Sequence, residues 1–179
     1  MERDEEIQDL LKFSVGLNLG ISYLSGAISY DPTVNTVDAD VASMIVWLDC
    51  MLMNVDRTAK NTNMLIWNRQ LWLIDHGAAL YFHHGPQDWN EQAKKPFTLI
   101  KDHVLLRQAT LLVEAEVKAK AKLTHDKINE IVSLIPDAWL VEGISFDEQR
   151  ERYAQYFNIR LANAAVFISE ANHAREALI

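Results

Sequence analysis

The chain has 179 residues, a hydrophobic fraction of 49% and a formal net charge of −8. This length fits one domain with a substantial core, and the hydrophobic content is too high for a disordered protein. The acidic balance argues against nonspecific nucleic-acid binding, which requires a basic surface. The longest apolar runs are shorter than the ~20 residues that cross a bilayer, so we expect no membrane partner.

The start of the chain and its cysteine content predict a cellular location. The first residues, MERDEEIQDLL, are acidic and mixed, whereas a secretory leader is basic and then apolar. Cys50 is the single cysteine, so no disulfide can form within the chain. Together these features predict a reducing, cytoplasmic setting.

The first half of the chain predicts one central helix and one β-hairpin. Apolar residues at helical spacing indicate a helix around residues 7–14, and glycines make residues 16–34 irregular. Residues 37–53 are apolar on most of the helix circumference, which is typical of a buried helix. The segments 64–67 and 71–74 have strand character and are joined by a short polar turn.

The second half of the chain predicts mostly helix. We expect a loop over 81–96, helical stretches at about 98–108 and 110–122, a helix capped by Thr124 and ended by Pro136, and a capping box at 145–148 that opens a helix to about 177. No repeat or linker interrupts the sequence. The expected fold class is therefore mainly α (α+β), a single helical domain over 1–179 with one small hairpin.

Three polar residues stand beside turns on either side of this hairpin. Asp56 and Asn61 follow the helix 37–53, and Asp75 follows the second strand, close to Gly77. A two-stranded ribbon can bring such loops together. Carboxylate and amide oxygens suit Mg²⁺ and leave room for phosphate oxygens, and a further acid can orient an attacking hydroxyl. The pattern by itself is compatible with phosphoryl transfer, but capping of the loops by Asx turns is the commoner explanation for such residues.

Other polar residues have structural explanations. Asp49 lies on the buried helix, and an unpaired buried acid is costly, so we expect it to pair with Arg57 or with loop amides. His76, His83 and His84 lack the spacing of a common zinc site, and no cysteine accompanies them.

The pattern D-x4-N-x-DR-x3-N followed by IDHG resembles the catalytic and metal loops of HipA-like atypical kinases, and more distantly those of phosphoinositide kinases. The segments LIDHGAALYFHH and KDHVLL extend the resemblance over nearly the whole chain. The matching positions are Asp49, Asn54, Asp56, Arg57, Asn61, Asp75 and Gly77.

The resemblance implies a protein-kinase-like C-terminal lobe that uses ATP and Mg²⁺. Asp56 matches the catalytic aspartate that accepts or orients the substrate hydroxyl proton. Asn61 and Asp75 match the residues that bind the metal and, through it, the nucleotide. The supporting positions are Asp49, Asn54, Arg57 and Gly77. Relatives often have His where this chain has Thr58, a departure that affects the expected rate rather than the fold.

A kinase of this type also needs an N-terminal lobe that covers the phosphates and supplies a lysine to them. The glycine-bearing GLNLG at 16–20 lacks the strand–loop–helix context of a phosphate loop. We therefore expect that the nucleotide-clamping lobe is absent from these 179 residues and that the chain alone is inactive. The first helix and residues 16–30 should then form an apolar surface for the missing lobe, a partner chain or a second copy.

The expected function follows from the resemblance. When completed by an N-terminal lobe, the chain would transfer the ATP γ-phosphate to Ser or Thr of a protein substrate. The alternative is a catalytically inactive kinase-like lobe that serves as a protein-binding module.

Overall fold

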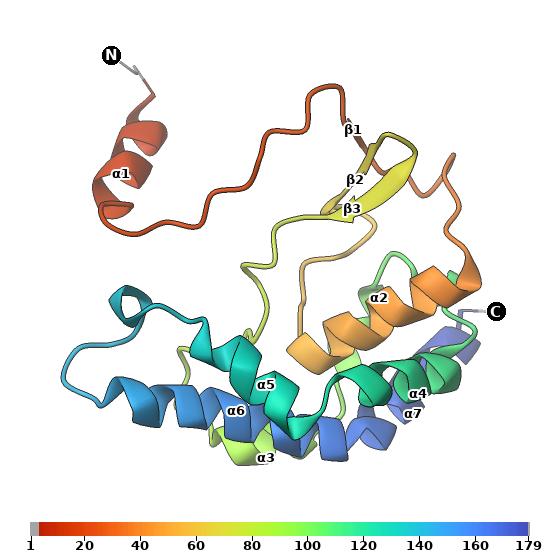
Figure 1. Cartoon of the computed structure of the whole chain (residues 1–179). Helices are drawn as coiled ribbons and strands as arrows, with labels where there is room; N and C mark the ends of the chain where they lie inside the picture. Colours follow the sequence, from red (N-terminus) through yellow and green to blue (C-terminus); the bar gives the residue numbers. More distant parts are fainter. Residues whose placement is uncertain (1–3, 179) are drawn as a thin grey trace.

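The computed structural model describes residues 4–178 (Figure 1). Its elements in chain order are α1 (Glu5–Phe13), β1 (Ile28–Ser29), α2 (Ala39–Leu52), β2 (Met64–Trp67), β3 (Gln70–Leu73), α3 (Trp89–Lys94), the 3₁₀ helices η1 (Thr98–Asp102) and η2 (Leu106–Gln108), α4 (Leu112–Lys122), α5 (His125–Ser133), the 3₁₀ helix η3 (Asp137–Trp139), α6 (Phe146–Ala162) and α7 (Ala164–Glu176). The mainly helical architecture with a small sheet is confirmed.

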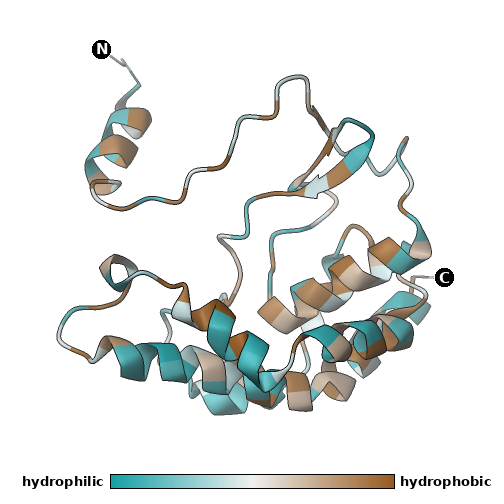
Figure 2. Cartoon of the chain, viewed as in Figure 1, coloured by the Kyte–Doolittle hydropathy of each residue, from teal (hydrophilic) through white to brown (hydrophobic). Residues whose placement is uncertain are grey.

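The core surrounds α2, as its nearly all-apolar circumference predicts. This helix packs against α4, α6 and α7, and apolar residues run along its length in Figure 2. Trp47 on α2 meets Phe167 on α7 edge to face, with ring centroids 5.9 Å apart, a favourable geometry for an aromatic pair. The central helix is therefore a fixed base for the loop that follows it.

The small sheet has three antiparallel strands in the order β1–β2–β3. Met64 pairs with Leu73 and Trp67 with Gln70, so the hairpin turn consists of Asn68 and Arg69 alone. Both turn residues have positive φ, 49° and 62°, as the tight two-residue hairpin turn requires. The predicted hairpin is confirmed, but its turn is one residue shorter than expected. The two-residue β1 lies in a stretch that we expected to be irregular.

Three predicted segments differ from the structure. The helix expected over 98–108 is two short 3₁₀ turns, η1 and η2. The loop expected over 81–96 contains α3, whose N-cap Asp88 accepts hydrogen bonds from the backbone of Asn90 and Glu91. The long C-terminal helix is divided at Asn163, whose side chain donates to the carbonyl of Ile159 at 2.8 Å. Such polar breaks are hard to predict because the apolar spacing continues past them.

The N-terminal segment extends away from the helical body (Figure 1). Its attachments include hydrogen bonds from two tryptophan side chains, Trp139 to the carbonyl of Leu17 at 2.7 Å and Trp67 to that of Ser25 at 2.9 Å. The segment exposes large apolar side chains, as expected: Ile7, Leu10, Leu11, Phe13, Val15, Leu17, Leu19, Ile21 and Tyr23. Exposed apolar patches mark interaction surfaces. Over residues 4–178, no helix is both long and apolar enough to cross a membrane.

Candidate functional site

The loop that carries Asp56 and Asn61 begins at a defined helix end. Met53 takes the left-handed conformation with φ 50°, and α2 stops there. The N–H of Asn54 donates to the carbonyl of Asp49 at 2.9 Å, and that of Met53 donates to Cys50 at 3.3 Å. This pair of bonds is the Schellman motif, which satisfies the last carbonyls of a helix. The turn directs the chain into the loop 54–63.

A buried carboxylate on α2 anchors this loop. Asp49 accepts hydrogen bonds from Arg57 Nε at 2.6 Å, from Asn54 Nδ2 at 3.0 Å and from His103 Nε2 at 3.0 Å. The side chains of Asp49 and Arg57 are fully buried, and the expected pairing of the two is confirmed. Burial by itself raises the pKa of Asp49, but the hydrogen bonds from His103 and Arg57, with the positive charge of Arg57, hold that pKa below its usual value.

Asp56 is the hydrogen-bond centre of the loop. Its Oδ2 accepts from Asn61 Nδ2 and from Asn63 Nδ2, each at 3.0 Å. The donors on Asn61 therefore point inward, and its amide oxygen has no hydrogen-bond partner among residues 4–178. Asn61 is exposed, so this oxygen is accessible to a cation. The sequence predicted that Asp56 and Asn61 lie close together, but Asn63 was not identified. The repeat N-x-N at residues 61–63 was the available signal.

Thr58 closes the same loop. Its backbone N–H donates to the carbonyl of Asn61 at 2.9 Å, and its hydroxyl accepts from the Asn61 N–H at 3.3 Å. Thr58, which stands where relatives often have His, therefore helps to shape the loop. Its hydroxyl adds no positive charge near a phosphate.

Asp75 occupies the other side of the hairpin. The preceding residue, Ile74, donates its N–H to the carbonyl of Asn63 at 3.0 Å, which ties Asp75 to the Asp56 loop. Asp75 itself has φ 49°, and its Oδ1 accepts from the N–H of Gly77 at 3.3 Å. A Cβ on Gly77 would lie 3.3 Å from the same oxygen, so glycine relieves crowding at this turn. That Asn61 and Asp75 share one cation stays a prediction.

The donor chemistry fits a hard cation. Oδ2 of Asp75 and the amide oxygen of Asn61 lack hydrogen-bond partners in the described part of the chain. Magnesium is commonly held by one or two such oxygens together with water and phosphate. Residues 4–178 contain no group of three or more His, Cys, Asp or Glu side chains suited to a metal ion.

An apolar cavity of about 520 Å³ adjoins Asp75. The N-terminal segment forms one wall and the sheet side forms the other, and the lining residues are Ile21, Ser22, Tyr23, Leu24, Ala27, Leu65, Ile74 and Asp75. Ser22 and Tyr23 have no backbone hydrogen bond to any residue in 4–178. The cavity therefore combines apolar walls with free backbone groups and one carboxylate at its edge.

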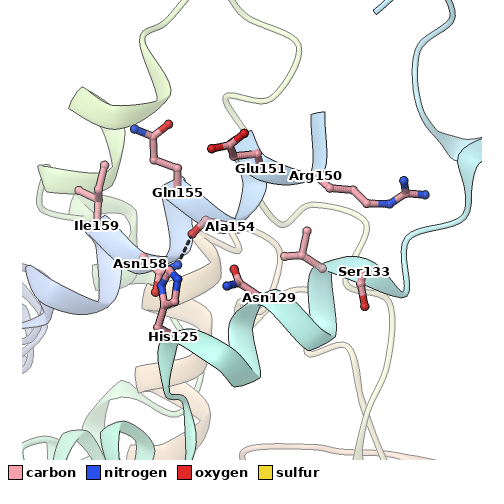
Figure 3. A pocket seen from close by; sticks show the side chains of 10 residues that line it. His125, Asn129, Ser133, Arg150, Glu151, Ala154, Gln155, Asn158 and Ile159 are labelled. Carbon is pink, nitrogen blue, oxygen red and sulfur yellow. Dashed lines mark hydrogen bonds between the residues drawn. The ribbon is translucent and has the colours of Figure 1, made fainter. Parts of the chain in front are cut away.

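A second cavity, of about 570 Å³, lies between α5 and α6 and is drawn in Figure 3. Its lining includes no residue of the loop 54–63 and not Asp75. Two of its polar side chains already have partners: Arg150 donates to the carbonyl of Ile135 at 2.7 Å, and Asn158 donates to that of Ala154 at 2.8 Å. This groove is separate from the candidate site.

The fold and site define a mainly helical protein with an Asp/Asn loop cluster held beside a β-hairpin. The family model described as HipA-like kinase matches residues 7–166. The chain therefore belongs to the HipA-like kinase family. No curated protein and no solved structure matches it.

Proposed function

We propose that this chain carries the catalytic and metal-binding loops of an ATP-dependent protein Ser/Thr kinase. The observation that carries the proposal is the contact of Asp56 with Asn61, at 3.0 Å, in a chain that belongs to a kinase family. One carboxylate and one amide in direct contact match the pairing of a substrate-orienting acid with a metal ligand.

In this proposal each residue has one task. Oδ1 of Asp56 orients the acceptor hydroxyl and takes its proton, while Oδ2 stays fixed by Asn61 and Asn63. The amide oxygen of Asn61 and the carboxylate of Asp75 would hold Mg²⁺. When bound, Mg²⁺ supplies positive charge that neutralises the phosphates. Asp49 and Arg57 keep the loop in place.

The cavity beside Asp75 would take the adenine ring of ATP. Leu65 and Ile74 offer apolar contact from the sheet side, and the free backbone of Ser22 and Tyr23 offers hydrogen bonds to ring nitrogens. Asp75 at the cavity edge then lies on the side toward which the triphosphate would extend from the adenine and ribose. A second lobe that clamps the triphosphate would complete the site, since phosphoryl transfer depends on positioning and charge stabilisation.

Asp75→Asn tests the metal site. Asn tolerates the left-handed conformation and keeps an oxygen for the Gly77 N–H, so the turn should persist while the charge is lost. We expect Mg²⁺-dependent binding of a non-hydrolysable ATP analogue, followed by calorimetry, to weaken at least about tenfold. The matched control is Asp147→Asn, an exposed acid on α6. Equal effects of the two substitutions would contradict a metal-binding role for Asp75.

Ala27→Phe tests the nucleotide cavity. The added phenyl ring would occupy space between the N-terminal segment and Leu65. We expect it to abolish measurable binding of the ATP analogue while Mn²⁺ binding in the absence of nucleotide stays intact. Val34→Phe adds the same ring at an exposed position outside the cavity and should change neither. Unaltered analogue binding by Ala27→Phe would remove the nucleotide from this cavity.

The alternative function is a kinase-like lobe that binds a protein partner without catalysis. The exposed apolar side chains from Ile7 to Tyr23 favour it, because they offer a contact surface independent of the loops. An ATP-analogue titration separates the two functions: a lobe with no affinity for Mg²⁺-nucleotide, even with a second lobe supplied, would be a binding module.

A further inference from the structure

His103 is a buried histidine outside the set of expected site residues. It follows η1, and only 7% of its surface is exposed. Its Nδ1 accepts a hydrogen bond from the backbone N–H of Leu105 at 3.0 Å. Because Nδ1 is an acceptor, the ring proton lies on Nε2, and Nε2 donates to Asp49 Oδ2 at 3.0 Å. Both ring nitrogens therefore have defined partners.

The backbone around His103 is joined to the loop next to Asp56. His103 forms an isolated antiparallel bridge with Thr58, and the N–H of Val104 donates to the carbonyl of Arg57 at 3.0 Å. Arg57 and Thr58 directly follow Asp56 in the chain. A segment about 45 residues further along thus supports the Asp56 loop from one side.

A side-chain path also connects His103 with Asp56. His103 and Arg57 both donate to Oδ2 of Asp49. Arg57 Nη1 then donates to the carbonyl of Asn63 at 2.6 Å, and Asn63 Nδ2 donates to Asp56 Oδ2. Each hydrogen bond in the path is 3.0 Å or shorter.

We propose that His103 is a positioning residue, which sets the Asp56–Asn61 loop for metal binding through its Nε2–H bond to Asp49. The proposal rests on the proposed function, because it assigns His103 to the same site. A histidine that only filled the core would not need the side-chain bond to Asp49, and the backbone bridge to Thr58 places that bond beside the loop. Loss of a group hydrogen-bonded directly to a metal ligand typically weakens metal affinity by about 10- to 100-fold. His103 acts through Asp49 rather than on a ligand, so we expect an effect near the lower end of this range.

Two polar substitutions separate the two ring nitrogens. His103→Gln places an amide donor near the position of Nε2 and can still reach Asp49. His103→Asn places its amide near Nδ1, so it can accept from Leu105 but is too short for Asp49. We expect Mn²⁺ affinity, measured by electron paramagnetic resonance, to fall by about tenfold in the Asn variant. It should stay within about threefold of wild type in the Gln variant, which retains the charged hydrogen bond.

A second measurement does not depend on metal. The N–H of Thr58 donates to Asn61 across the loop, so we expect its hydrogen-exchange protection to fall in the Asn variant and persist in the Gln variant. Ile128→Ala, a buried substitution on α5, is the control for lost stability; it should leave both Thr58 protection and Mn²⁺ affinity unchanged.

The outcomes distinguish the two proposals. A wild-type chain that binds no Mn²⁺, with or without the ATP analogue, contradicts the proposed metal site, whereas loss of Thr58 protection in the Asn variant alone still supports positioning by His103. If the Asn and Gln variants match in both measurements, or if Ile128→Ala loses as much, the positioning role is overturned. Should the Asn variant not fold, the wild type decides: Mg²⁺ must shift the His103 Nε2–H signal in NMR spectra, and an unmoved signal overturns the role.

Discussion

Replacing Asp56 by Asn is expected to lower phosphoryl transfer by about 10²- to 10⁴-fold, the usual effect of losing a positioned acid–base group. Asn keeps one side-chain oxygen that can accept from Asn61 and Asn63, so the loop should stay folded. What it loses is the carboxylate that, in the proposed function, would take the proton of the acceptor hydroxyl. Binding of the ATP analogue should therefore change much less than the rate.

The assay uses radiolabelled ATP and a two-lobed form of the protein, in which a nucleotide-clamping lobe is supplied to the 179 residues. Under the proposed function the 179 residues alone should show almost no transfer, because a second lobe would have to supply the rest of the clamp on the triphosphate. Asp147→Asn serves as the control for an acid on an exposed helix face. Full activity in the two-lobed Asp56→Asn variant would contradict the assignment of the base. Robust transfer by the 179 residues alone would contradict the need for a second lobe.

The strongest sequence patterns predicted the parts of the fold that support the site. The apolar circumference of 37–53 gave the buried helix α2, and two β-rich segments gave the hairpin. Both signals are local, so they can be read from neighbouring residues. The close contact of Asp56 with Asn61 follows from the same local logic, because the two residues share one short loop.

The partners that come from elsewhere in the chain were not predictable in this way. His103 reaches Asp49 across a sequence separation of 54 residues, and no periodic pattern marks such a contact. Asn63 differs from these partners, because it lies in the same loop as Asp56, directly before β2, and the N-x-N repeat could have indicated it. The cavity beside Asp75 forms because residues 21–27 pass close to Leu65 and Ile74, an arrangement that only the tertiary structure defines.

The second large effect is expected at Asp49. Replacing it by Ala leaves the fully buried guanidinium of Arg57 without its carboxylate and removes the acceptor of the His103 N–H. Breaking a buried pair by removing one partner typically costs about 3–5 kcal/mol, because an uncompensated charge stays in the core. We expect a loss of that size in the free energy of unfolding, measured by urea denaturation.

A matched surface pair gives the control. Lys118 and Asp40 form an ion pair whose side chains are about half exposed. Asp40→Ala should cost only about 0–1 kcal/mol, since water and salt screen exposed charges. A loss at Asp49 no larger than the loss at Asp40 would contradict the anchoring role.

The double variant Asp49→Leu with Arg57→Met tests whether the cost comes from the unpaired charge. It removes both charges, so it should be less destabilised than the sum of the two single variants.

The wild-type pair also predicts a pH dependence. The pKa of Asp49 in the folded state lies below its ordinary value of 3.8, so its contribution to stability is complete above that pH and is lost as the pH falls through the folded pKa. In urea titrations between about pH 7 and pH 2, the wild type should therefore lose stability relative to the double variant as the pH falls, because the double variant lacks this carboxylate. Curves that stay parallel over this range would show that the Asp49 carboxylate does not hold the loop through its charge.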